Sequence, residues 1–218
     1  MQLKVNGRKR LKINKKKFIY LISPNKISNH DFYSDLCAIL ETKKISFFQL
    51  RLKNTSNKRK FVIGKKIKKI CKKYNVNFIV NDDPILARKL NADGCHLGQK
   101  DMKINDARKI LKNKIIGITC HNSIKLAKIA ISNKADYLAI GAFHASKTKK
   151  ITYKAKINTL HSIKKISKIP IVAIGGINSS NYKKLLLNNA NFLAISGYIW
   201  NNKKYKPLED IRKINNED

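Results

Sequence analysis

The stretch Asn91 to Asp101 (NADGCHLGQKD) contains one complete helix-to-strand connection of this chain, together with the loop that follows the strand. It closes a stretch of helical periodicity, continues as the short apolar run Gly94 to Leu97, and ends in a polar loop. Two similar triplets, Lys134-Ala135-Asp136 and Asn189-Ala190-Asn191, stand in the same position before later apolar runs. These repeats predict a fold built from helix–strand units.

Eight apolar runs rich in β-branched or aromatic residues alternate with segments of helical periodicity. They are Phe18–Ile22, Ile45–Leu50, Val76–Val80, Gly94–Leu97, Ile115–Thr119, Tyr137–Ile140, Ile169–Ile174 and Phe192–Ile195. Continuous apolar runs are typical of strands buried on both faces of a parallel sheet. The pattern predicts an α/β protein, a single (β/α)8 TIM barrel. A doubly wound open sheet is the alternative, because periodicity does not reveal closure.

The predicted barrel occupies residues 18–206. Residues 1–17 form a basic N-terminal extension, which lacks the apolar core of a secretory signal. Residues 207–218 form the end of a final helix and a tail. The triplet Ser179-Ser180-Asn181 predicts an N-terminal cap for a helix that begins at Tyr182.

The composition is strongly basic, with 48 Lys and Arg against 13 Asp and Glu and a net charge of +35. The lysines are spread along the whole chain, and Lys, Asn and Ile are abundant together, so the charge indicates AT-rich codons rather than a nucleic-acid site. Weak, salt-sensitive binding of polyanions could still follow from it. No run is long enough to span a bilayer. The four cysteines show no metal or disulfide spacing and predict free thiols in a cytoplasmic protein. A homo-oligomer is left open.

Acidic residues are scarce, yet two of them follow successive predicted strands. Asp82 comes directly after the third run, and Asp101 lies in the loop after the fourth. The carboxyl ends of barrel strands share one face, where active sites lie. Carboxylate oxygens on two loops suit Mg²⁺ with bound phosphates, so these acids are the predicted metal ligands. For the adjacent Asp83 we expect a helix cap instead.

Other polar groups are predicted at the same face. Alternation places Gln49, Arg51 and Lys53 on one side of the second strand's end, where an amide and two cations suit a polar ring and a diphosphate. Phosphate contacts are expected in three further loops. Their candidates are Ser146, Thr148 and Lys149 after the sixth run, Gly175-Gly176 after the seventh, and Ser196-Gly197 after the eighth, with a simple tight turn as the alternative for the two glycines. His96 and His121 are expected to be packed, hydrogen-bonded residues.

In this order, the motifs resemble those of the thiamine-phosphate synthase family. The matching residues are Gln49-x-Arg51-x-Lys53, Asn81-Asp82, His96-Leu97-Gly98-Gln99-x-Asp101, Gly117-Ile118-Thr119-x-His121, Ala135-Asp136-Tyr137, Thr148-Lys149 and Ala173 to Ile177. They cover roughly residues 18–200. The loop after the sixth run departs from the family pattern, since Ala142 follows Gly141 where a proline is usual.

The resemblance implies a transferase that couples hydroxymethylpyrimidine diphosphate to hydroxyethylthiazole phosphate or its carboxylated form. It further implies that diphosphate leaves before the thiazole nitrogen attacks, so that no nucleophilic side chain is needed. The implied catalytic residues are Arg51, Thr119 and Lys149, and the implied Mg²⁺ ligands are Asp82 and Asp101. The implied substrate contacts are Gln49, Leu50, Arg51, Leu52, Lys53, Asn81, Thr119, Ser146, Lys147, Thr148, Lys149, Gly175, Ile195 and Ser196.

Two alternatives remain open at this stage. A thiazole tautomerase shares the barrel of this family and uses a histidine in the loop after the sixth strand, where this chain has His144. A polyanion-binding protein on a degenerate barrel would account for the net charge, although Asp82 and Asp101 would repel nucleic acid. Retention of the pyrimidine and metal motifs favours the synthase.

Overall fold

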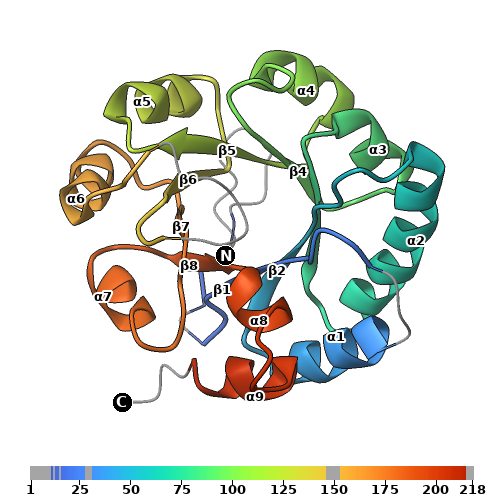
Figure 1. Cartoon of the computed structure of the whole chain (residues 1–218). Coiled ribbons are helices and arrows are strands. Elements are labelled where there is room, and N and C mark those ends of the chain that lie inside the picture. The colour runs from blue at the N-terminus through green and yellow to red at the C-terminus, as the bar shows by residue number, and fades with distance from the viewer. Residues whose placement is uncertain (1–10, 12, 15, 28–30, 146–152, 215–218) are drawn as a thin grey trace.

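The eight predicted strands form a closed parallel barrel in the computed structural model, which describes residues 11, 13–14, 16–27, 31–145 and 153–214 (Figure 1). Each strand pairs with its sequence neighbours, and β1 pairs with β8 to close the sheet. The strands are β1 Ile19–Ile22, β2 Ile45–Leu50, β3 Asn77–Asn81, β4 Gly94–Leu97, β5 Ile115–His121, β6 Tyr137–Gly141, β7 Ile171–Ile174 and β8 Phe192–Ile195. The prediction of a (β/α)8 barrel is confirmed, and the open sheet is excluded.

Helices surround the barrel on the outside (Figure 1). They are α1 Asp31–Glu41, α2 Asn57–Lys73, α3 Pro84–Lys89, α4 Ile104–Leu111, α5 Ile124–Ser132, α6 Ile157–Ile166, α7 Tyr182–Leu187, α8 Gly197–Trp200 and α9 Pro207–Arg212. The last of these, α9, packs against α1 and α8. The described residues contain no helix long and apolar enough to cross a membrane.

The apolar side chains divide into an outer and an inner cluster. The outer cluster lies between the strands and the helices and contains most of the buried Leu and Ile residues. The inner cluster fills the barrel with Tyr20, Phe47, Tyr137 and Phe192 among others, and Leu11 of the N-terminal segment packs against it. The strands are therefore covered on both faces, as their continuous apolar runs predicted.

The repeated triplets mark equivalent turns at the amino-terminal face of the barrel. Their first residues, Asn91, Lys134 and Asn189, all have positive φ angles of 48–73°. Each central alanine is buried, and its N–H donates to a carbonyl five residues earlier, which ends the preceding helix. The repeat recognised in the sequence is thus a helix-ending turn that leads into a strand.

Two predicted helix caps had different outcomes. Asp83 accepts a hydrogen bond from the Leu86 N–H at 2.8 Å and caps α3, as expected. Asn181 is the N-cap residue of α7 as expected, although its side chain makes no cap hydrogen bond. Its side-chain oxygen instead accepts the Asn178 N–H at 3.0 Å, within the preceding turn.

Candidate active site

The polar residues predicted after β2 to β5 meet at the carboxyl-terminal mouth of the barrel. Asp82 follows β3 with a φ of 64°, and its N–H donates to the His96 carbonyl at 2.8 Å. Asp101 bends back toward β4, where its carboxylate accepts the Gly98 N–H at 2.6 Å. These backbone contacts fix both acids beside the ends of neighbouring strands.

The two carboxyl groups of Asp82 and Asp101 lie close enough to share a hydrogen bond. Desolvation raises the pKa of Asp82 to about 6, and the hydrogen bond and negative charge of Asp101 act in the same direction. Arg51 and Asn81 lower this pKa by smaller amounts. Among the described residues, no group of three or more His, Cys, Asp or Glu could hold a metal ion. The acids form a pair that needs further oxygen ligands to complete a magnesium site.

Arg51 lies on the β2 side of this pair. Its Nη1 atom donates to the side-chain oxygen of Asn25 at 3.0 Å, and its backbone N–H donates to the Ser23 hydroxyl at 2.9 Å. The loop after β1 therefore positions this arginine, a role that the sequence did not reveal. Lys53 is exposed, whereas the side chains of Leu50 and Leu52 are buried in the outer cluster. Those two leucines could contact a ligand only through their backbone.

A chain of buried polar side chains runs beneath the mouth. The Nε2 atom of Gln49 donates to the Tyr20 hydroxyl at 2.9 Å, and that hydroxyl lies 2.7 Å from the Tyr137 hydroxyl. His96 joins Tyr137 to Thr119, with its Nδ1 atom 2.9 Å from the Tyr137 oxygen and its Nε2 atom 2.8 Å from the Thr119 hydroxyl. The packed, hydrogen-bonded role expected for His96 is confirmed.

The two tyrosines of this hydrogen-bond network, Tyr20 and Tyr137, were not predicted as site residues, because both lie in apolar strands. A signal was present, since a buried tyrosine hydroxyl usually has a hydrogen-bond partner. The sequence does not show which partner that is. Gly117 provides the space for one of the rings, because a Cβ atom at this position would overlap the Tyr137 ring.

The opposite side of the mouth contains the turn after β7. Gly175 and Gly176 have positive φ angles of 106° and 58°. A side chain at Gly176 would overlap the Ala145 carbonyl, so both the backbone angle and the available space require glycine. The His144 N–H donates to the Gly175 carbonyl at 3.0 Å, which joins the loop after β6 to this turn.

Two lysines, Lys154 and Lys184, act electrostatically on His144 at this second side of the mouth. Desolvation lowers the pKa of His144, and the charges of Lys154 and Lys184 lower it further. Nearby, the Ser196 hydroxyl donates to the Ser23 carbonyl at 3.1 Å, and Ile195 is buried at the end of β8. The predicted residues Ser146, Lys147, Thr148 and Lys149 lie outside the described residues.

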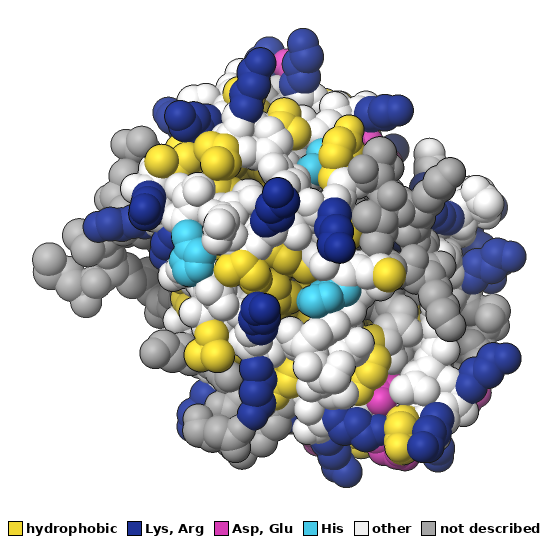
Figure 2. All heavy atoms as spheres, turned by 60° about the vertical axis from the view of Figure 1, so that its left-hand side comes forward, with side chains coloured by type: hydrophobic (Ala, Val, Ile, Leu, Met, Phe, Trp, Pro, Cys, Tyr) yellow, Lys and Arg dark blue, Asp and Glu magenta, His cyan; other side chains and the backbone are white. Residues whose placement is uncertain are grey.

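His121 lies beside the active-site residues of β5. Its ring packs against Tyr153 with a centroid distance of 4.4 Å, in agreement with the packed role expected for it. On the face drawn in Figure 2, lysine and arginine side chains are dispersed among apolar and uncharged groups instead of forming one basic patch. This distribution on the visible face does not favour a nucleic-acid interface.

The fold and the site together define a class, a (β/α)8-barrel enzyme whose mouth presents paired carboxylates, an arginine and a glycine turn suited to phosphorylated substrates. The family model described as thiamine monophosphate synthase matches residues 19–199, and the chain belongs to this family. It is therefore an enzyme, a transferase of the thiamine-phosphate synthase group.

Known proteins support this assignment over nearly the whole chain. A thiamine-phosphate synthase of Pelagibacter ubique is 71% identical over 206 residues, which cover 94% of this chain and 99% of the relative. One from Clostridium tetani is 40% identical and covers 82% of this chain and 84% of its own length. The solved thiamine phosphate pyrophosphorylase from Pyrococcus furiosus superposes with a TM-score of 0.79 at 28% identity, covering 92% of this chain and 94% of that one.

Proposed function

We propose that this enzyme couples hydroxymethylpyrimidine diphosphate to hydroxyethylthiazole phosphate, or its carboxylated form, and releases thiamine phosphate and diphosphate. The observation that supports this most directly is the Asp82–Asp101 pair beside Arg51, opposite a glycine turn with lysines nearby. The first side suits a diphosphate, and the second suits a monophosphate. Two phosphorylated substrates could thus meet over the barrel mouth.

The donor set fits Mg²⁺. Two neighbouring carboxylates provide hard oxygen ligands, and a bound cation would offset both the desolvation that mainly raises the pKa of Asp82 and the negative charge of Asp101 that adds to it. When bound, the ion would neutralise charge on the diphosphate. Asp82 and Asp101 would hold it, and the remaining positions would be filled by water and diphosphate oxygens.

The protein residues would then favour departure of the diphosphate. The bond between the pyrimidine methylene carbon and the diphosphate oxygen breaks, and the bonding electrons leave with the diphosphate. Arg51 and Lys149 stabilise the charge that develops there. Gln49, Asn81 and Thr119 hold the pyrimidine, while the thiazole nitrogen attacks the methylene carbon from nearby.

The contacts of the second substrate complete the proposal. Ser146, Lys147, Thr148, Gly175 and the backbone of Ile195 and Ser196 are assigned to the thiazole phosphate. Lys53 and the backbone of Leu50 and Leu52 are assigned to the pyrimidine diphosphate. We also place the enzyme in the cytoplasm, since its four free cysteines fit a reducing compartment.

The coupling reaction itself is the test. Purified protein with Mg²⁺ and the two phosphorylated halves should form thiamine phosphate at ordinary salt concentration, with release of one diphosphate per product. Absence of product, together with tight and salt-sensitive RNA binding, would instead support the polyanion-binding alternative.

The position of His144 keeps the thiazole tautomerase as a second candidate. This residue lies in the loop after β6 and contacts the Gly175 turn. Coupling by His144→Ala should stay within a few-fold of wild type, our estimate for a residue outside the charge-stabilising set. If wild type never couples and His144→Ala abolishes thiazole isomerisation, the tautomerase replaces the synthase.

A further inference from the structure

The buried polar chain connects two residues that face the proposed pyrimidine site. Gln49 at the end of β2 and Thr119 on β5 are its ends, and Tyr20, Tyr137 and His96 are its links. The three links and Gln49 are all buried. Because the links are buried, their hydroxyls and ring nitrogens need protein partners, and the neighbours in this hydrogen-bonded chain provide them.

The hydrogen bonds of this buried network must all be donated in the same direction, from Gln49 toward Thr119. Gln49 donates from Nε2 to the Tyr20 oxygen, so the Tyr20 proton is directed to Tyr137. The Tyr137 proton then goes to Nδ1 of His96. A neutral imidazole with its acceptor at Nδ1 has its proton on Nε2, which donates to the Thr119 oxygen.

Burial supports the protonated state of both tyrosines on which this direction depends. Desolvation is the main cause that raises the pKa of Tyr20 and of Tyr137. The rings are also held firmly in place. Tyr137 stacks on His96 with a centroid distance of 5.6 Å, and Tyr20 stacks on Phe47 at 5.1 Å.

The direction of hydrogen-bond donation determines which donor or acceptor Gln49 and Thr119 can offer a ligand. Gln49 uses its amide nitrogen for Tyr20, so its side-chain oxygen remains as an acceptor. Thr119 accepts from His96, so its own hydroxyl proton remains as a donor. Rotating the Gln49 amide by 180° would place its oxygen against Tyr20, and every proton in the chain would have to reverse.

We propose that the buried chain from Gln49 to Thr119 holds the Gln49 amide in one orientation and thereby selects an aminopyrimidine over an oxopyrimidine. The inference rests on the proposed function, which places a pyrimidine between these two residues. An aminopyrimidine offers an amino N–H to the Gln49 oxygen and a ring nitrogen to the Thr119 hydroxyl. An oxopyrimidine presents a carbonyl oxygen and a ring N–H instead, so acceptor would face acceptor.

Tyr137 is a positioning residue in this scheme, since it acts through Gln49 and His96. In Tyr137→Phe the Tyr20 proton loses its acceptor. That proton is satisfied again only if the Gln49 amide rotates and accepts it. The variant should therefore favour the rotated Gln49 amide, whose nitrogen faces the ligand, and tolerate the oxopyrimidine better. Tyr20→Phe should release Gln49 altogether and give the same direction of change.

Calorimetry can measure this selection without the coupling reaction. The probes are 4-amino- and 4-oxo-pyrimidinylmethyl diphosphate, each titrated with Mg²⁺ into the full-length protein. Wild type should bind the amino compound more tightly. The Kd of the oxo compound divided by the Kd of the amino compound should fall by about tenfold or more in Tyr137→Phe and in Tyr20→Phe. Tyr182→Phe is the matched control, because Tyr182 is a buried tyrosine packed against Phe18 in the outer cluster. Its ratio should equal that of wild type.

A spectroscopic measurement on wild type keeps the inference testable even if a variant fails to fold. The ¹⁵N shifts of His96 should show the proton on Nε2, and Tyr137→Phe should shift the tautomer balance toward Nδ1–H. A proton on Nδ1 in wild type, or unchanged Kd ratios in both folded variants, would overturn the inference. If selection and tautomer behave as stated but no thiamine phosphate forms, the proposed function fails while the chain's role stands.

Discussion

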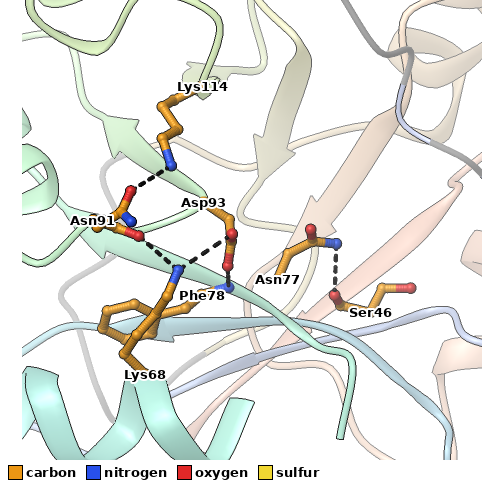
Figure 3. Close-up of polar contacts among 7 residues, drawn as sticks. All are labelled: Ser46, Lys68, Asn77, Phe78, Asn91, Asp93 and Lys114. Atoms are coloured by element: carbon orange, nitrogen blue, oxygen red, sulfur yellow. Dashed lines mark hydrogen bonds and ion pairs between the residues drawn. The ribbon is translucent and has the colours of Figure 1, made fainter. Parts of the chain in front are cut away.

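The carboxylate of Asp93 accepts a hydrogen bond from the backbone N–H of Phe78 at 2.8 Å and so joins the turn before β4 to the start of β3 (Figure 3). Lys68 lies over the same carboxylate at 3.3 Å and also donates to the Asn91 carbonyl at 2.6 Å. The side chain that ends the triplet therefore fastens neighbouring strands at the face opposite the site.

The same bond recurs in the other two triplets. Asp136 accepts the Ile116 N–H at 2.8 Å, and Asn191 accepts the Ile171 N–H at 2.9 Å. Because the uncharged Asn191 side chain makes the same contact, the contact requires an acceptor oxygen but not a negative charge. The repeat in the sequence thus has a physical reason, because its last side chain satisfies an N–H of the first or second residue of the preceding strand.

Removing that acceptor should destabilise the barrel. Asp136→Ala leaves the Ile116 N–H and the Arg108 guanidinium without this partner, so we expect the free energy of unfolding to fall by about 1–3 kcal/mol. Asp136→Asn keeps the acceptor and should lose less. Urea unfolding measures both, with Asp106→Ala on the exposed face of α4 as the control. Equal stability of the alanine variant and wild type would show that the contact is dispensable.

The fold was predictable because its determinants are local in sequence. Apolar runs, helical periods and the triplets each lie within a few neighbouring residues, and Asp83 caps α3 only three residues away. The seventh strand was predicted to begin at Ile169 but begins at Ile171, because Pro170 has no N–H for the ladder. Local patterns therefore place the elements to within a residue or two.

The contacts inside the site were less predictable because they join distant residues. Tyr20 and Tyr137 lie 117 residues apart, and His96 reaches Tyr137 across 41 residues. Alternation along a strand gives the side on which a residue points, but it does not give the partner it meets across the barrel. The carboxylate pair was predicted because both acids follow strands that are neighbours in sequence as well as in space.

Loss of a metal ligand should lower turnover far more than stability. Asp101→Ala removes one of the two proposed Mg²⁺ ligands, and we expect kcat for coupling to fall on the order of a hundredfold or more. Asp106→Ala, which removes an exposed acid that pairs with Lys109, should couple at the wild-type rate. Steady-state diphosphate release measures both variants. Full activity of Asp101→Ala, or of wild type in excess chelator, would refute the metal assignment.

The pH dependence of His144 reports on the proposed phosphate side of the mouth. Its pKa is lowered in the folded protein by desolvation and by Lys154 and Lys184. At pH values below the ordinary histidine pKa, the unfolded protein therefore binds more protons than the folded protein. The stabilising effect of a neutral His144 is therefore present above pH 6.5 and is lost as the pH falls through the folded pKa. NMR titration of the imidazole should show the lowered pKa.

Adding hydroxyethylthiazole phosphate should raise that pKa, because a bound anion favours the imidazolium and offsets the two lysines. Lys184→Ala should also raise it, in the absence of any ligand. His161 on α6, which contacts Asn188 and Asn189, provides a second imidazole signal for comparison. A pKa of His144 that is unchanged by saturating ligand would place the phosphate elsewhere.

Arg51 provides the last prediction, because its charge and its orientation can be separated. Arg51→Ala removes a fixed cation beside Asp82, so departure of the diphosphate should slow on the order of a hundredfold or more. Asn25→Ala leaves the cation but removes the 3.0 Å contact at Nη1, and a loss of about fivefold is expected for one hydrogen bond of about 1 kcal/mol. Lys58→Ala, at an exposed position of α2, controls for the change in net charge. Single-turnover rates of diphosphate release compare the three variants. If Asn25→Ala matches Arg51→Ala in rate, orientation rather than charge limits the step, and if Arg51→Ala matches wild type, this arginine has no part in stabilising the leaving group.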